Sequence, residues 1–181
     1  HPALSESLYV QLIADLADFM IEKFDNPQII LITHTYQDSK ITSLVYSKIK
    51  NKQKIRMLPS NLSATETKSV IGLCDLFICS RFHALVASTS LAVPSLGIVA
   101  YSKGKFHGII GNTIGQENYL IDVPDDFDYD IFLSQLKSKV TSLWCSREEV
   151  KQDLIKKGSY AKSQALLNGQ LIKELLNHKK L

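Results

Sequence analysis

Short apolar runs and amphipathic segments alternate along the middle of this chain. The apolar runs, each bounded by polar or turn-forming residues, lie at residues 29–33, 55–58, 75–79, 94–99 and 119–123. Apolar side chains recur at helical spacing in the intervening residues 41–50, 64–73 and 81–91. Ser63 and Glu66 have capping-box spacing before the second of these helices. The pattern predicts an α/β fold, with one mostly parallel sheet of about five strands and helices on both faces.

Helical patterns also flank the predicted sheet. Residues 5–24 carry an apolar stripe formed by Leu8, Leu12, Ile13, Leu16, Phe19 and Met20. A second helix is predicted over residues 130–143. Ser146 and Glu149 have capping-box spacing and open a long final helix that reaches about Leu176.

The strongest local signal lies in residues 74–97, which read CDLFICSRFHALVASTSLAVPSLG. A buried strand is followed directly by Ser80, which is a favourable N-cap, so a helix is predicted over residues 81–91. A strand that leads tightly into a helix places the first N–H groups of that helix at the carboxyl edge of the sheet, where open α/β sheets bind ligands. Arg81 and His83 lie in this first turn.

Two other polar loops follow predicted strands. His34 comes directly after the first strand, and residues 101–108, YSKGKFHG, follow the fourth. The second loop is cationic through Lys103 and Lys105, and it begins with Tyr101. We expect both loops to share one sheet edge with the Ser-Arg turn, since the carboxyl ends of parallel strands meet there, and to favour an anionic ligand. The alternatives are a solvent-exposed His34 and a merely solvated loop.

The string CDLFICSRFHAL at residues 74–85, followed by an apolar helix and a Val-Pro strand start, resembles the polysaccharide pyruvyl transferase family. In that family a strand that starts with an acid leads into Ser-Arg-Leu-His-Ala, and a Tyr and a Lys follow the next strand. The matching positions here are Ser80, Arg81, Phe82, His83 and Ala84, then Tyr101 with Lys103 or Lys105. His34 and Asp38 also resemble a His and an Asp of the family. The chain departs from the pattern at Phe82, where Leu is usual, and at Ala92, where Gly is common.

The resemblance implies an architecture. Such transferases have two Rossmann-like halves in a GT-B-like arrangement, and the motif lies in the C-terminal half. We therefore expect residues 1–181 to form one Rossmann-like domain of a longer enzyme, with a helical extension at 128–181 and a missing N-terminal domain. From about Tyr160 the final helix is expected to contact that domain or another copy of the chain, as in a homo-oligomer. A break at Gly158 that folds the helix back is the alternative.

The resemblance also implies an activity: transfer of a pyruvyl group from phosphoenolpyruvate to a pair of sugar hydroxyls, as a ketal, in cell-surface polysaccharide biosynthesis. Arg81 would bind the donor's carboxylate and phosphate, and His83 would act as acid/base or contact the donor. Further substrate contacts would come from Ser80, Phe82, Tyr101, Lys103, Lys105 and His34. No metal and no cofactor beyond the donor substrate is expected. The competing interpretations are an ion pair that fixes the helix start for Arg81, and a histidine buried against the sheet for His83.

Two other functions fit the same fold class. A GT-B-type glycosyltransferase would bind a nucleotide sugar at the same edge and could use Glu117 or Asp122 for the ribose hydroxyls. A non-catalytic α/β ligand-binding module is also compatible with the sequence.

The composition narrows the class of protein. The chain has 45% hydrophobic and 22% charged residues and a formal net charge of +3, which is ordinary for a globular protein. Its basic excess follows Lys137 and is interpreted as a solvated helix face, so no nucleic-acid partner is expected. No apolar run is long enough for a transmembrane segment. We expect a cytoplasmic enzyme, at the inner face of the membrane if its saccharide acceptor is lipid-linked.

Overall fold

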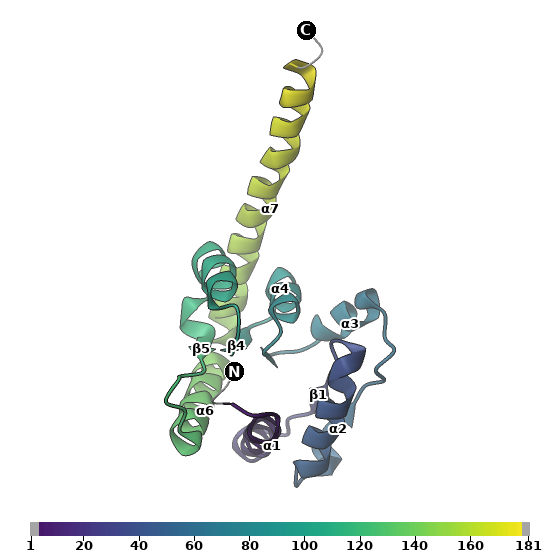
Figure 1. Cartoon of the computed structure of the whole chain (residues 1–181), viewed down its shortest axis with the longest axis vertical. Helices are drawn as coiled ribbons and strands as arrows, with labels where there is room; N and C mark the ends of the chain where they lie inside the picture. The colour runs from purple at the N-terminus through teal and green to yellow at the C-terminus, as the bar shows by residue number, and fades with distance from the viewer. Residues whose placement is uncertain (1–3, 179–181) are drawn as a thin grey trace.

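The computed structural model describes residues 4–178 as two small parallel sheets surrounded by helices (Figure 1). The elements are α1 (Glu6–Lys23), β1 (Ile29–Leu31), η1 (Tyr36–Asp38), α2 (Ser39–Lys48), η2 (Lys52–Lys54), β2 (Ile55–Met57), α3 (Ala64–Ile71), β3 (Phe77–Cys79), α4 (Phe82–Ser90), β4 (Ser95–Val99), α5 (Lys103–Lys105), η3 (Phe106–Thr113), η4 (Glu117–Tyr119), β5 (Leu120–Asp122), α6 (Tyr129–Cys145) and α7 (Arg147–His178). The α/β class and the element order agree with the sequence analysis.

All five predicted strands form, and all are parallel, but the prediction of one continuous sheet is wrong. β1 pairs with β2, whereas β3, β4 and β5 form a separate sheet in that order. The two sheets are packed into different hydrophobic cores: β2 contributes Ile55 to one, while β4 contributes Leu96 and Ile98 to another. The edge strands β1 and β3 face a cleft instead of pairing with each other.

Helix α1 lies between these two cores. Leu12 and Leu16 pack into the core of the three-stranded sheet together with α6, and Val10, Ala14 and Ala17 pack into the core shared with α2 and β2. Figure 1 shows α1 with α6 on one side and α2 on the other. The sequence predicted a single apolar stripe, but α1 buries two faces, because small alanines allow close approach of a second helix.

The helix that follows β3 begins differently from the prediction. Ser80 was expected to be its N-cap, but Arg81 holds that position, without a side-chain cap bond. The Ser80 hydroxyl is bonded to Tyr9 instead. By contrast, the capping box of Ser63 and Glu66 at the start of α3 is confirmed.

The segment after β4 is more ordered than predicted. Residues 101–108 were expected to be an adaptable loop, but the short helix α5 leads there into η3, a π-helix. η3 buries Phe106 and Ile110 in a third core with Leu85 of α4. This packing explains why the glycine-containing segment is helical.

Helix α7 runs continuously through Gly158 and Gly169, so the alternative of a break at Gly158 is wrong. Val150 and Leu154 are buried near its start, whereas the large apolar side chains from Tyr160 to Leu176 are exposed. In Figure 1 its distal half extends away from the other elements. Within residues 4–178, no helix combines the length and the low polarity that crossing a membrane requires.

Candidate active site

A cleft of about 880 Å³ separates β1 from β3. Its polar rim contains His34 and Asp38, which follow β1, Ser80 and Arg81, which follow β3, and Tyr101, which follows β4. Its remaining walls include apolar side chains of α1, α3 and the two edge strands. The structure thus brings together, at the carboxyl ends of three parallel strands, the predicted residues His34, Ser80, Arg81 and Tyr101.

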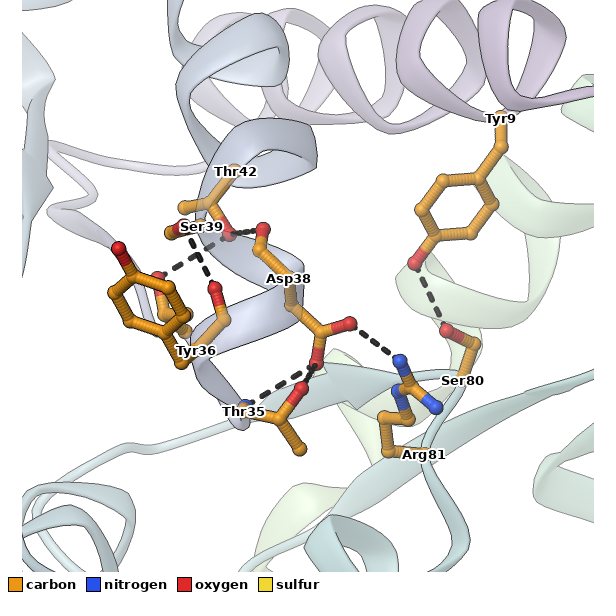
Figure 2. Close-up of polar contacts among 9 residues, drawn as sticks. Tyr9, Thr35, Tyr36, Asp38, Ser39, Thr42, Ser80 and Arg81 are labelled. Atoms are coloured by element: carbon orange, nitrogen blue, oxygen red, sulfur yellow. Dashed lines mark hydrogen bonds and ion pairs between the residues drawn. The ribbon is translucent and has the colours of Figure 1, made fainter. Parts of the chain in front are cut away.

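The ion pair between Arg81 and Asp38 bridges this cleft (Figure 2). Arg81 donates from Nη2 to Asp38 Oδ1, while Asp38 Oδ2 accepts from the Thr35 backbone N–H at 3.2 Å and from Thr35 Oγ1 at 3.0 Å. This capping box fixes Asp38 at the last position of the 3-10 helix η1, three residues after its N-cap Thr35. The tertiary ion pair that the sequence left as an alternative for Arg81 is therefore present.

The electrostatics of this pair favour the charged forms. Partial burial raises the pKa of Asp38, but the hydrogen bonds from Arg81 and Thr35 outweigh burial and hold that pKa below its ordinary value. The same bond raises the pKa of Arg81. The Arg81 side chain is 54% exposed, against 17% for Asp38. Arg81 therefore keeps donors available for a second anion in the cleft.

Tyr9 joins the site from α1 and was missed by the sequence analysis. Its hydroxyl lies 2.9 Å from Ser80 Oγ and its ring lines the cleft (Figure 2). Burial is the main reason that the pKa of Tyr9 is raised. Tyr9 lies outside the motif region and is not on the predicted apolar stripe, so no sequence signal pointed to it.

The two histidines of the predicted site are both exposed, so the alternative of a solvent-exposed His34 is confirmed, although part of His34 is covered where it lines the cleft. Burial lowers the pKa of His34, although the nearby Asp38 carboxylate opposes this shift. His83 is exposed, with its ring edge-on to Phe82 at 5.5 Å, so the alternative of a histidine buried against the sheet is wrong. Phe82 itself packs on Phe106 in the third core. Phe82 and His83 lie beside the cleft lining, not in it.

A second polar cluster lies at the carboxyl end of β5. His107 is 2.6 Å from Glu117 Oε1 through Nδ1 and 2.9 Å from Asp122 Oδ1 through Nε2. These two hydrogen bonds raise the pKa of His107, and the one to Asp122 has the larger effect. Gly111 permits the close approach of Glu117, because a Cβ there would lie 1.9 Å from Glu117 Oε2. Lys103 Nζ is 3.4 Å from Asp122 Oδ2.

This cluster bears on two of the predictions. Glu117 and Asp122, the candidates for binding ribose in a glycosyltransferase, are both engaged by His107. Lys103 and Lys105 lie outside the lining of the cleft, and Lys103 forms an ion pair with Asp122. Among residues 4–178 we find no ion-pair partner for Lys105.

Two further features of the described chain concern possible metal ligands and the thiol of Cys79. Residues 4–178 contain no group of three or more His, Cys, Asp or Glu side chains placed to hold a metal ion. Burial raises the pKa of the Cys79 thiol to about 12, so this thiol stays protonated near neutral pH.

The fold and the site define an α/β protein with a cationic side chain, Arg81, and a histidine, His34, in a cleft at the carboxyl ends of parallel strands. The family model for polysaccharide pyruvyl transferase matches residues 1–102, more than half of the chain. The chain therefore belongs to the polysaccharide pyruvyl transferase family. The match includes every residue of the cleft rim and ends just before Lys103. No curated protein and no solved structure gives a significant match.

Proposed function

We propose that this protein transfers a pyruvyl group from phosphoenolpyruvate to a pair of sugar hydroxyls in polysaccharide biosynthesis. Family membership supports the reaction class, and the observation that carries the proposal is the half-exposed Arg81 at the rim of the cleft. A guanidinium held on one side by Asp38 still presents N–H groups to a carboxylate or phosphate. Phosphoenolpyruvate offers both groups in one small molecule.

The reaction needs one proton delivery and one leaving group. The methylene carbon of the donor takes up a proton and becomes the methyl group of the ketal. The two sugar oxygens form bonds to the central carbon, and the bond from that carbon to the phosphate oxygen breaks. Inorganic phosphate leaves. One of the two hydroxyl protons replaces the proton delivered to the methylene carbon, and the other goes to the leaving phosphate.

We assign the proton delivery to His83, which is exposed and follows Arg81 by two residues. Histidine exchanges protons near neutral pH, which suits general acid catalysis. His34, with its pKa lowered by burial, is assigned to substrate contact in the neutral form. Lys105 is our choice for the phosphate, because Lys103 is already paired with Asp122.

The acceptor is proposed to be a saccharide of a cell-surface polysaccharide. If it is lipid-linked, the reaction would take place at the inner face of the membrane. The acceptor hydroxyls must reach the central carbon of a donor bound at Arg81, so the acceptor is expected to enter over the polar rim of the cleft.

The proposal can be tested by calorimetric titration with phosphoenolpyruvate and, separately, with a nucleotide sugar, the ligand expected for a glycosyltransferase. We expect saturable binding of phosphoenolpyruvate and no binding of the nucleotide sugar. Arg81→Ala should chiefly raise KM for the donor, and His83→Ala should chiefly lower kcat, because one residue holds charge and the other moves a proton. Arg56→Ala is the matched control, since the Arg56 guanidinium lies on β2 and bonds only backbone carbonyls among the described residues. Donor kinetics that are equal in the Arg81→Ala and Arg56→Ala variants would contradict the proposal.

A further inference from the structure

The hydrogen bond between Tyr9 and Ser80 connects α1 to the turn that carries Arg81. Its partners are 71 residues apart in the chain, and the two oxygens are 2.9 Å apart. Ser80 follows β3 directly and lines the cleft next to Arg81. Tyr9 also lines the cleft, so both partners of this bond belong to the cleft wall.

The direction of this bond decides what Ser80 can offer a ligand. A serine hydroxyl has a single proton to donate but can accept through its lone pairs. When Ser80 donates to Tyr9, its proton is used inside the protein. When Tyr9 donates, the Ser80 proton is available for another acceptor. Burial raises the pKa of Tyr9, so its hydroxyl remains protonated and able to donate at neutral pH.

An anion beside Arg81 selects between these two directions. Oxygens of a carboxylate or phosphate accept hydrogen bonds and cannot donate when ionised. Only the direction from Tyr9 to Ser80 leaves Ser80 as a donor to such an oxygen. A bond to a charged acceptor is stronger than one between neutral hydroxyls, so the bound anion stabilises that direction.

We propose that Tyr9 is a positioning residue of the donor site: its hydroxyl donates to Ser80 Oγ, and Ser80 in turn donates to an oxygen of the anion held by Arg81. This inference rests on the proposed function, because it takes the anion to be phosphoenolpyruvate. It gives α1 a part in substrate binding that the Ser-Arg-Phe-His motif does not contain.

Tyr9→Phe tests the proposal because it removes one oxygen and keeps the ring. We expect Kd for phosphoenolpyruvate to rise about tenfold, equivalent to about 1.4 kcal/mol. KM should rise similarly while kcat changes little, because the bond acts on binding and not on proton transfer. The matched control is Tyr129→Phe. Tyr129 also bonds α1, donating to Asp15 Oδ2 at 2.7 Å, but it lies outside the cleft lining.

Ser80→Ala and the double variant with Tyr9→Phe complete the test. If Tyr9 acts through Ser80, Tyr9→Phe has no further effect on Kd once Ser80 is alanine, so the two changes are non-additive. Ser80→Ala alone should weaken binding at least as much as Tyr9→Phe. Ser80→Ala thus tests the hydrogen bonds from Tyr9 to Ser80 and from Ser80 to the anion without changing a residue of α1.

The outcomes separate the inference from the proposed function. Wild-type protein that does not bind phosphoenolpyruvate overturns both. Normal wild-type binding with an unchanged Kd in Tyr9→Phe overturns the inference alone. Equal weakening in Tyr9→Phe and Tyr129→Phe, or additive effects of Tyr9→Phe and Ser80→Ala, also overturns it, because the effect would then come from anchoring α1.

Discussion

Exchanging Asp38 for asparagine measures how much the ion pair across the cleft stabilises the fold. Asparagine keeps an oxygen that can accept from the Thr35 backbone, but it removes the charge that pairs with Arg81. Exposed ion pairs contribute about 0–1 kcal/mol. Asp38 is largely buried, yet Arg81 is more than half exposed and its charge is screened by water. We therefore expect the free energy of unfolding to fall by about 1 kcal/mol at pH 7, which is roughly 2–4 °C in Tm for a chain of this size.

The pH dependence of this difference has a definite sign. The pKa of Asp38 in the folded state lies below its ordinary value of 3.8, so the pair contributes its full stability above that value. The contribution is lost as the pH falls through the folded pKa. The difference in Tm between the wild type and Asp38→Asn should therefore be constant from pH 5 to 7 and should shrink at lower pH. High salt should also reduce it.

Glu66→Gln is the matched control for this measurement. Glu66 closes a capping box with Ser63 at the start of α3, just as Asp38 does with Thr35, but it has no arginine partner in the described chain. Thermal unfolding of the three proteins at pH 7 and at acid pH isolates the ion pair from the capping box. The reasoning fails if Asp38→Asn costs no more stability than Glu66→Gln at pH 7, or if its larger cost persists unchanged in acid.

Three further changes test the packing around the site. Gly97→Ala should lower the free energy of unfolding by about 1–3 kcal/mol, because the new Cβ would lie 2.8 Å from side-chain atoms of both Leu85 and Leu120. An unchanged midpoint of urea unfolding would contradict this prediction. The ion pairs of charged His107 stabilise the wild type below pH 6.5, and this stability is lost as the pH rises through the raised pKa of His107. His107→Asn should therefore lower Tm in acid, and the two Tm values should converge in alkaline solution. A difference in Tm that widens there would refute the raised pKa of His107. Deleting residues 160–181 should leave Tm nearly unchanged, since the apolar side chains of the described distal helix are exposed, and sedimentation should show less self-association. A monomeric wild type with a sharp fall in Tm on deletion would exclude the predicted contact of this helix with another domain or another copy of the chain.

Much of the secondary structure was readable from local patterns. Ser63 and Glu66 predicted the start of α3 correctly, because a capping box is formed by residues three positions apart. The failures came where distant contacts compete with local preference. Ser80 has the chemistry of an N-cap, but Tyr9 takes its hydroxyl, and so Arg81 holds the cap position.

Strand pairing was less predictable than strand existence. The apolar run of each strand is encoded locally, whereas the neighbour of a strand depends on which core its side chains join. Ile55 and Leu96 belong to strands of similar composition, yet they pack in different cores. The order β1–β2 and the order β3–β4–β5 follow from that packing, and sequential position alone does not reveal it.

Which residues belong to the candidate site was easier to predict than how they are paired. The strand-to-helix turn singled out Arg81, and the rule that parallel strands end at one edge brought His34 and Tyr101 beside it. The partner of Arg81 could not be read from the sequence, because Asp38 is 43 residues away and follows β1, a strand of the other sheet. The roles of all these residues in catalysis stay predictions.

The geometry of the site depends on a helix that the motif does not contain. Asp38 follows β1 and Arg81 follows β3, and these strands are not hydrogen-bonded to each other. α1 packs one face on each of the two cores, so it connects the two parts of the fold that carry Asp38 and Arg81. A change in the packing of α1 would alter the candidate site although neither charged residue lies on that helix. The bond from Tyr9 to Ser80 belongs to the same connection, since it ties α1 directly to the turn that presents Arg81.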